Sequence, residues 1–202
     1  MAERRVTRDD ECGCVVVRDI SSNFQHTTAM RTESPRGPII TIDGPAGSGK
    51  STTARLLASR LGFAYLDTGA MYRAAALLGA RLGTHLGVES EVNDMLARLD
   101  LAFSAPHPGD DRPRVLLSGE DITDAIRTPQ IDRLVSPVAA HPSIRRHMAG
   151  LQKKFAEQGR VVLEGRDTGT IVCPDADVKI YLDAALDERA KRRLNQRADE
   201  LS

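Results

Sequence analysis

The stretch Gly44-Pro45-Ala46-Gly47-Ser48-Gly49-Lys50-Ser51 fits the pattern G-x-x-x-x-G-K-[ST], which is typical of a phosphate-binding loop. Residues 38–43, just before it, form an apolar, β-branched run that predicts a buried parallel strand. Residues 52–61, just after it, carry apolar residues at helical spacing and are followed by Gly62, a common helix terminator. Strand, glycine-rich loop and helix are the order in which such a loop turns its backbone N–H groups and the positive end of a helix toward phosphates.

This loop predicts a site for a nucleoside triphosphate. Lys50 is placed to reach the β- and γ-phosphates, and the Ser51 hydroxyl is placed to bind Mg²⁺. An ordinary glycine-rich turn is the alternative, but such a turn needs neither the Lys-Ser pair nor these flanks. The predicted nucleotide-binding residues are the loop and the residue after it: Gly44, Pro45, Ala46, Gly47, Ser48, Gly49, Lys50, Ser51 and Thr52.

Length and composition narrow the class of protein. A chain of 202 residues is long enough for one α/β domain with an insertion. Its 28 basic and 28 acidic residues balance, which argues against nucleic acid as a partner, and no apolar run reaches the length of a membrane span. Three cysteines (Cys12, Cys14 and Cys173) make no disulfide framework or metal site. We expect a cytoplasmic protein and a monomer.

Residues 1–36 differ in composition from the rest of the chain. They mix charges of both signs with polar residues, and Cys14-Val15-Val16-Val17 is the sole hint of a strand. Such a segment buries too little apolar surface to offset the entropy of ordering it, so we expect it to be largely disordered. One explanation is that translation starts at Met30, and the competing one is a regulatory or targeting arm.

From residue 37 onward the pattern predicts an α/β fold with a parallel sheet. Residues 84–140 are less regular and predict an inserted subdomain with its own small antiparallel sheet. The expected strands are residues 63–66, 101–103, 115–117, 161–163 and 178–182, and the expected helices are residues 70–82, 91–99, 143–158 and a basic helix from 186.

Two further clusters of polar residues come directly after predicted strands of the main sheet. They are residues 67–73 and residues 164–170, and ligands of open α/β sheets bind beyond the carboxyl ends of the strands. Arg166 offers a planar fork that suits phosphate oxygens. Asp167 would repel a phosphate, so it needs a hydrogen-bond donor, and the exocyclic amine of cytosine is a natural one. Alternatively, both residues pair with neighbours and shape a turn.

Four stretches resemble bacterial cytidylate kinases and occur in that family's order. They are ITIDGPAGSGKST (40–52), YLDTGAMYR (65–73), SGEDITDAIRT (118–128) and VLEGRDTGTIVCPDADVKIYLDA (162–184), and the resemblance runs from about residue 38 to the C-terminus. It implies a P-loop nucleoside-monophosphate kinase with a parallel sheet core, an inserted nucleoside-monophosphate-binding subdomain and a mobile lid. It also implies transfer of the γ-phosphoryl group of ATP to CMP or dCMP with Mg²⁺.

The resemblance also implies roles for individual residues. Lys50, Arg73 and Arg166 would be catalytic, and the two arginines would hold the CMP phosphate. Ser136, Arg145 and Asp167 would read the cytosine, and Thr68 would lie near the acceptor nucleotide.

For four more residues the sequence allows both a functional and a structural interpretation. Arg189 and Arg193 lie four residues apart on the last helix, so that they could reach ATP or form an ordinary solvated face. Asp43 and Glu164 end strands near the phosphate loop, where each could hold a Mg²⁺-bound water or be structural.

The resemblance further implies a lid, a final strand and a closing helix beyond Ser202, so we expect a truncated chain. Such a chain would bind CMP but turn over slowly, because phosphoryl transfer depends on positive charge around the transferred group. It would also leave the strand 178–182 as an exposed hydrophobic edge. The alternatives are a nucleotide-binding protein without catalysis and a kinase for another small acceptor, such as UMP or a sugar acid. An ionised Asp167 would repel the carbonyl that uracil carries in place of the cytosine amine.

Overall fold

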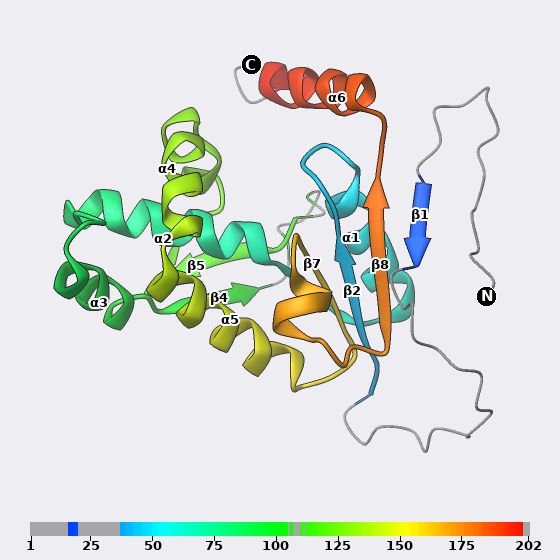
Figure 1. Cartoon of the computed structure of the whole chain (residues 1–202), viewed down its shortest axis with the longest axis horizontal. Helices are drawn as coiled ribbons and strands as arrows, with labels where there is room; N and C mark the ends of the chain where they lie inside the picture. The colour runs from blue at the N-terminus through cyan, green and yellow to red at the C-terminus, as the bar shows by residue number, and fades with distance from the viewer. Residues whose placement is uncertain (1–15, 20–36, 105, 107–109, 111, 200–202) are drawn as a thin grey trace. The chain divides into compact units, whose positions relative to one another are not determined.

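A computed structural model describes residues 16–19, 37–104, 106, 110 and 112–199 (Figure 1). The chain divides into two compact units, one formed by residues 1–66 and 153–202 and the other by residues 67–152. Each unit has its own sheet and its own helices. The predictions made for Cys12, Cys14 and Met30 lie outside the described residues.

The first unit is built on a five-stranded sheet in the order β1-β8-β2-β7-β3. The central strand β2 pairs in parallel with both β7 and β8, with Ile42 opposite Glu164 on one side and Ile180 on the other. All five residues of β2 are buried, as its unbroken apolar run predicted. The predicted parallel sheet is confirmed. The strand bounds are β1 Val16–Asp19, β2 Ile39–Asp43, β3 Ala64–Asp67, β7 Val161–Gly165 and β8 Val178–Asp183.

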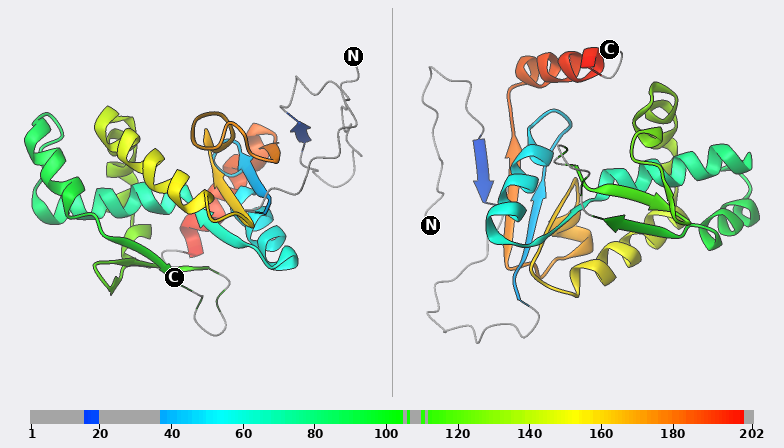
Figure 2. Two further views of the ribbon diagram at one scale, coloured as in Figure 1. Left: turned by 90° about the horizontal axis from the view of Figure 1, so that it is seen from below. Right: turned by 180° about the vertical axis from the view of Figure 1, so that it is seen from behind.

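Helix α1 (Lys50–Leu61) covers this sheet by packing against β2 and β7. Its small residues Ala54 and Ala58 face the strands, where they join Ile40, Ile42, Val162 and Leu182 in one apolar core. The short π-helix η2 (Thr168–Val172) follows β7, and helix α6 (Leu186–Asp199) follows β8 (Figure 2). The helix predicted after the phosphate loop and the basic helix from residue 186 are therefore confirmed.

The outer edge of β8 is occupied by β1. The two strands run antiparallel, with Val17 opposite Leu182, and lie side by side in Figure 1. The prediction that residues 178–182 form an exposed edge is therefore wrong, because the backbone groups of β8 find partners in β1. Four residues of the predicted N-terminal extension thus form a strand, and the rest of that extension lies outside the described residues.

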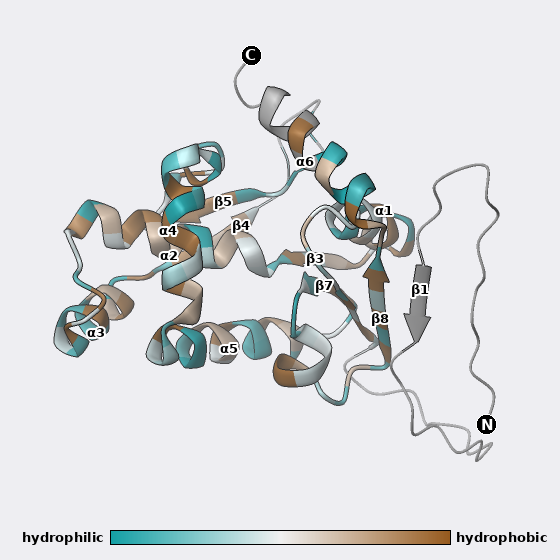
Figure 3. Ribbon diagram, turned by 45° about the horizontal axis from the view of Figure 1, so that its top comes forward, coloured by the Kyte–Doolittle hydropathy of each residue, from teal (hydrophilic) through white to brown (hydrophobic). Residues whose placement is uncertain are grey.

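The second unit combines a bundle of helices with a small sheet. Helix α2 runs through it and packs against α3 and α4, and apolar residues recur along α2 (Figure 3). The sheet β4-β5-β6 is antiparallel throughout, which confirms the small antiparallel sheet predicted for this part of the chain. The elements are α2 Thr68–Leu82, α3 Glu89–Ala97, β4 Leu101–Ser104, β5 Arg114–Leu117, β6 Glu120–Asp121, the 3₁₀ turn η1 Ala125–Arg127, α4 Pro129–Ala140 and α5 Pro142–Ala156.

Helix α4 was not predicted from the sequence. Pro137 lies in its interior, where proline removes a backbone hydrogen bond and usually ends a helix. The start of α4 nevertheless has the features of a helix terminus: Pro129 occupies its first turn, and the Thr128 hydroxyl accepts a hydrogen bond from the Ile131 N–H at 3.4 Å. The inserted subdomain predicted over residues 84–140 lies within the second unit.

Candidate functional site

The phosphate-loop residues connect β2 to α1 in the first unit. Gly44, Gly47 and Gly49 have φ angles of 152°, 77° and 94°, which side chains rarely tolerate. A Cβ atom on Gly44 would lie 2.0 Å from the Leu182 carbonyl oxygen, so that this position accepts glycine alone. The Ser48 hydroxyl is buried and has no hydrogen-bond partner among the described residues. The Lys50 ammonium donates to the Pro45 carbonyl at 2.8 Å, across the loop.

The N-terminus of α1 offers backbone donors to a ligand. Gly49 caps the helix in a left-handed conformation and provides no side chain, and the first turn holds no acidic residue. The first-turn N–H groups and the positive end of the helix dipole therefore favour an anion. Ser51 and Thr52 lie in this turn with exposed side chains.

Asp43 joins the phosphate loop to the loop that carries Arg166 and Asp167. Its buried carboxylate accepts hydrogen bonds from the Thr168 N–H at 2.9 Å, the Thr168 hydroxyl at 2.7 Å and the Gly169 N–H at 2.8 Å. These three donors give Asp43 a structural role, which is one of the two roles that the sequence allowed for it. The structure thus brings the residue before Gly44 against the segment after Asp167, with Arg166 exposed and Asp167 half-buried.

Glu164, the other strand-end carboxylate, is also buried. It accepts a hydrogen bond from the Tyr65 hydroxyl, which comes from the neighbouring part of the sheet. Carboxylates often gather around a metal ion. Among the described residues, no group of three or more histidine, cysteine, aspartate or glutamate side chains has an arrangement that could hold one.

Helix α6 lies against the phosphate loop. A Cβ atom on Gly47 would meet the Arg189 carbonyl oxygen at 2.9 Å, and one on Gly49 would lie 3.5 Å from Nη1 of Arg192. The Arg189 Nε atom is buried without a hydrogen-bond partner in the described part of the chain. Arg192 was not predicted from the sequence. Its spacing of three residues from Arg189 places the two side chains on the same face of α6, and this spacing could have indicated it. The side chain of Arg193 lies outside what the structure describes, so its role stays a prediction.

In the second unit, Thr68 and Arg73 both lie on α2. Thr68 is buried at the first position of the helix, which is capped by a hydrogen bond from the Ala70 N–H to the Asp67 carboxylate at 2.9 Å. The Arg73 guanidinium forms an ion pair with Asp132 and donates to the Ile126 carbonyl at 3.3 Å. Arg73 is thus held in place from two sides.

Ser136 and Arg145 come from α4 and α5. Both side chains are exposed, and Arg145 Nη1 donates to the carbonyl of Ala139 at 3.4 Å. Ala139 lies three residues after Ser136, on the same face of α4. The Arg145 guanidinium therefore lies near the helix face that carries Ser136, and these are two of the residues expected to read cytosine.

The comparisons with known proteins agree with one another. A family model described as "Cytidylate kinase" matches residues 40–202. The chain is 48% identical over 154 residues to a protein named "Cytidylate kinase" from Carboxydothermus hydrogenoformans, covering 76% of this chain and 68% of the relative. A protein of the same name from Pelotomaculum thermopropionicum is 48% identical over 161 residues, covering 80% and 70% of the two chains.

A third relative, from Geobacter sulfurreducens, is also named "Cytidylate kinase" and is 46% identical over 164 residues, covering 81% of this chain and 69% of its own. In the described part of the chain, no helix has the length and apolar character that a bilayer span requires.

Proposed function

Because the chain belongs to the cytidylate kinase family, we propose that it transfers the γ-phosphoryl group of ATP to CMP, with dCMP as a second acceptor. The names of the relatives support CMP as the acceptor and ATP as the donor, and no observation favours another small acceptor or a binding protein without catalysis. The observation that supports the proposal on this chain is the loop between β2 and α1. It leaves no room for a side chain at Gly44 or Gly47, and it is followed by the N–H groups of α1, which no side chain caps.

ATP would be bound by the phosphate loop and helix α6. The loop amides and Lys50 would hold the β- and γ-phosphates, and Arg189 and Arg193 would approach the same phosphates from α6. The loop residues proposed for ATP are Gly44, Pro45, Ala46, Gly47, Ser48, Gly49, Lys50, Ser51 and Thr52.

The residues present fit a Mg²⁺ ion that arrives with ATP. Ser51 exposes a hydroxyl in the first turn of α1, and Mg²⁺ prefers oxygen ligands that include substrate phosphates and water. When bound, Mg²⁺ would neutralise part of the phosphate charge. Asp43 is already occupied by three hydrogen bonds from Thr168 and Gly169, so we assign the metal to Ser51 alone among protein ligands.

CMP would be bound through both its phosphate and its base. Arg73 and Arg166 would hold the phosphate, because the guanidinium fork matches phosphate oxygens. Asp167 would accept a hydrogen bond from the cytosine amine, while Arg145 would donate to the acceptor edge of the base. Ser136 and Thr68 complete the proposed set.

The chemistry needs charge and alignment more than proton transfer. An oxygen of the CMP phosphate attacks the γ-phosphorus in line, the bond from that phosphorus to the bridging oxygen of ADP breaks, and CDP and ADP leave. The attacking oxygen is already anionic, so no general base is required. Lys50, Arg73 and Arg166 would neutralise the charge that spreads over the transferring group.

A coupled ADP-release assay with CMP, dCMP, UMP and AMP as acceptors tests this proposal. We expect turnover with CMP and dCMP and little with UMP or AMP. A preference for UMP would contradict the role of Asp167, and ATP binding without ADP release for any acceptor would favour a binding protein. That the protein is a cytoplasmic monomer without a nucleic-acid partner stays a prediction.

A further inference from the structure

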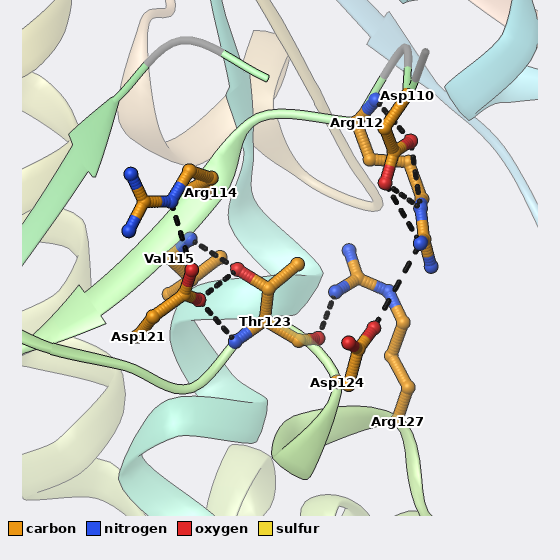
Figure 4. A network of polar contacts seen from close by, with 8 residues as sticks. All are labelled: Asp110, Arg112, Arg114, Val115, Asp121, Thr123, Asp124 and Arg127. Atoms are coloured by element: carbon orange, nitrogen blue, oxygen red, sulfur yellow. Dashed lines mark hydrogen bonds and ion pairs between the residues drawn. The ribbon is translucent and has the colours of Figure 1, made fainter. Parts of the chain in front are cut away.

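Arg127 is the last residue of the 3₁₀ turn η1 in the second unit, and its side chain is held by a hydrogen bond to the backbone of Thr123. Its half-buried guanidinium donates through Nη1 to the Thr123 carbonyl (Figure 4). Thr123 is itself buried and fixed, because Asp121 accepts from its N–H at 3.0 Å and its hydroxyl at 2.6 Å, and the Val115 N–H donates to that hydroxyl at 2.9 Å. The Arg127 side chain therefore has a defined position.

Arg127 differs from the other arginines around it, each of which forms an ion pair with an acidic residue of the described chain. Arg112 pairs with Asp110 at 2.8 Å, Arg114 pairs with Asp121 at 2.8 Å, and Arg73 pairs with Asp132. No carboxylate of the described residues forms an ion pair with Arg127. The nearby Asp124 contacts Arg112 instead, at 3.7 Å, and its side chain is 90% exposed (Figure 4).

The surroundings of Arg127 are unfavourable for its charge. Burial lowers the pKa of its guanidinium, the positive charges of Arg112 and Arg73 lower it further, and Asp67 and Asp124 partly oppose them. A cation withdrawn from water without an ion-pair partner costs free energy, which a bound anion would recover. Arg127 therefore has the charge, the fixed position and the unused pairing capacity of an anion ligand.

Arg73 links Arg127 to the proposed substrate. Arg73 Nη1 donates to the carbonyl of Ile126, the residue before Arg127, and the charge of Arg73 lowers the pKa of Arg127, so the two side chains, from α2 and η1, act on one another. Asp132 already offsets the charge of Arg73. A phosphate monoester with a charge of about −2 would thus contact two guanidinium groups: that of Arg73, whose charge Asp132 offsets, and that of Arg127, whose charge no ion pair among the described residues offsets.

We infer that Arg127 is a further phosphate ligand of the nucleoside monophosphate and shares that phosphate with Arg73. The inference rests on the proposed function, since it takes Arg73 as a phosphate ligand. It adds a residue whose role is to recognise the phosphomonoester itself, whatever base the nucleotide carries.

Calorimetric titration of the full chain with CMP and with cytidine tests this inference. Arg127→Gln is expected to weaken CMP binding about 10- to 100-fold, as loss of charge-assisted hydrogen bonds does, while cytidine binding stays within about threefold of wild type. Arg127→Lys keeps the charge but loses the fork, so its loss for CMP should be intermediate. Arg112→Gln is the matched control, because it removes a neighbouring charge that Asp110 already pairs, and it should change CMP binding by less than about threefold.

Two results would overturn the inference: equal losses for CMP and cytidine, which would mean that Arg127 shapes the fold, or no loss for either. If Arg127→Gln does not fold, as judged by its thermal melt, the CMP-to-cytidine ratio of Arg127→Lys decides by the same criteria. Titrating wild type with UMP and AMP separates this inference from the proposed function. A preference for one of them would contradict the CMP assignment, and Arg127 would then be tested with that nucleotide and its nucleoside.

Discussion

At the residue scale, Lys50 carries the clearest expectation. Lys50→Ala should lower kcat about 10²- to 10³-fold, because a positive charge aimed at the transferring phosphoryl group is lost. The melting temperature should change little, since the Lys50 ammonium acts at a loop carbonyl and not in the apolar core. Steady-state kinetics and a thermal melt check both, with the exposed Lys153→Ala on α5 as the control. Normal turnover in Lys50→Ala would remove the phosphate loop from the mechanism.

Asp167 should discriminate between the two nucleotides. Asp167→Ala is expected to weaken CMP binding by about 1–3 kcal/mol, the contribution of a specific contact to a base edge, and to leave ATP binding nearly unchanged. Calorimetric titration with each nucleotide measures this, with the exposed Asp94→Ala on α3 as the control. Parallel losses for CMP and ATP would instead indicate that the half-buried Asp167 holds its loop.

Some residue roles could be predicted from the sequence and others could not. The phosphate loop could be predicted because its glycines and Lys-Ser pair occur at fixed spacing along the chain. The roles of Asp43 and Arg127 could not, because they depend on partners distant in sequence. Asp43 meets Thr168 across 125 residues, and the unpaired state of Arg127 depends on which carboxylates its neighbours use.

At the element scale, Asp43 supports η2 from the end of β2. Asp43→Ala would leave the N–H groups of Thr168 and Gly169 and the Thr168 hydroxyl without their acceptor in a buried place. We expect a loss of unfolding free energy of about 1–3 kcal/mol or more, measured by urea denaturation. Thr170→Ala, an exposed change in the same turn, is the control and should be close to neutral. A neutral Asp43→Ala would contradict the structural role assigned to this carboxylate.

The helices and strands whose apolar residues recur at regular spacing were predicted from the sequence, whereas helix α4, which contains a proline, was not. The buried strand β2 and helices α1, α2 and α5 were predictable from apolar spacing and from terminal residues such as Gly62. Helix α4 escaped because Pro137 argues locally against a helix, while packing of α4 against α2 decides the outcome. Tertiary contacts therefore outweighed a local signal at the helix that carries both Ser136 and Asp132.

At the scale of the whole molecule, β1 covers the edge of β8, which would otherwise be an open, apolar strand edge. The double variant Val17→Pro/Arg18→Pro should remove at least one hydrogen bond to β8, because successive N–H groups of a strand point to opposite sides. We expect faster hydrogen exchange in residues 178–183 and more light scattering on warming. Val17→Thr/Arg18→Thr keeps both N–H groups and serves as the control. Unchanged exchange and scattering in the proline variant would show that this pairing does not protect β8.

The interrupted layout of the first unit sets an order for folding during synthesis. Residues 67–152 form one continuous unit, whereas the first unit needs segments from both sides of it. Thr168, the hydrogen-bond partner of Asp43, lies 125 residues further along the chain. A ribosome that adds 5–20 residues per second synthesises it about 6–25 s after Asp43. The second unit can close in that interval, while the apolar strand β2 has neither β7 nor β8 beside it. We therefore expect the nascent chain to expose apolar surface, and to bind chaperones, over this interval, before Val161 emerges.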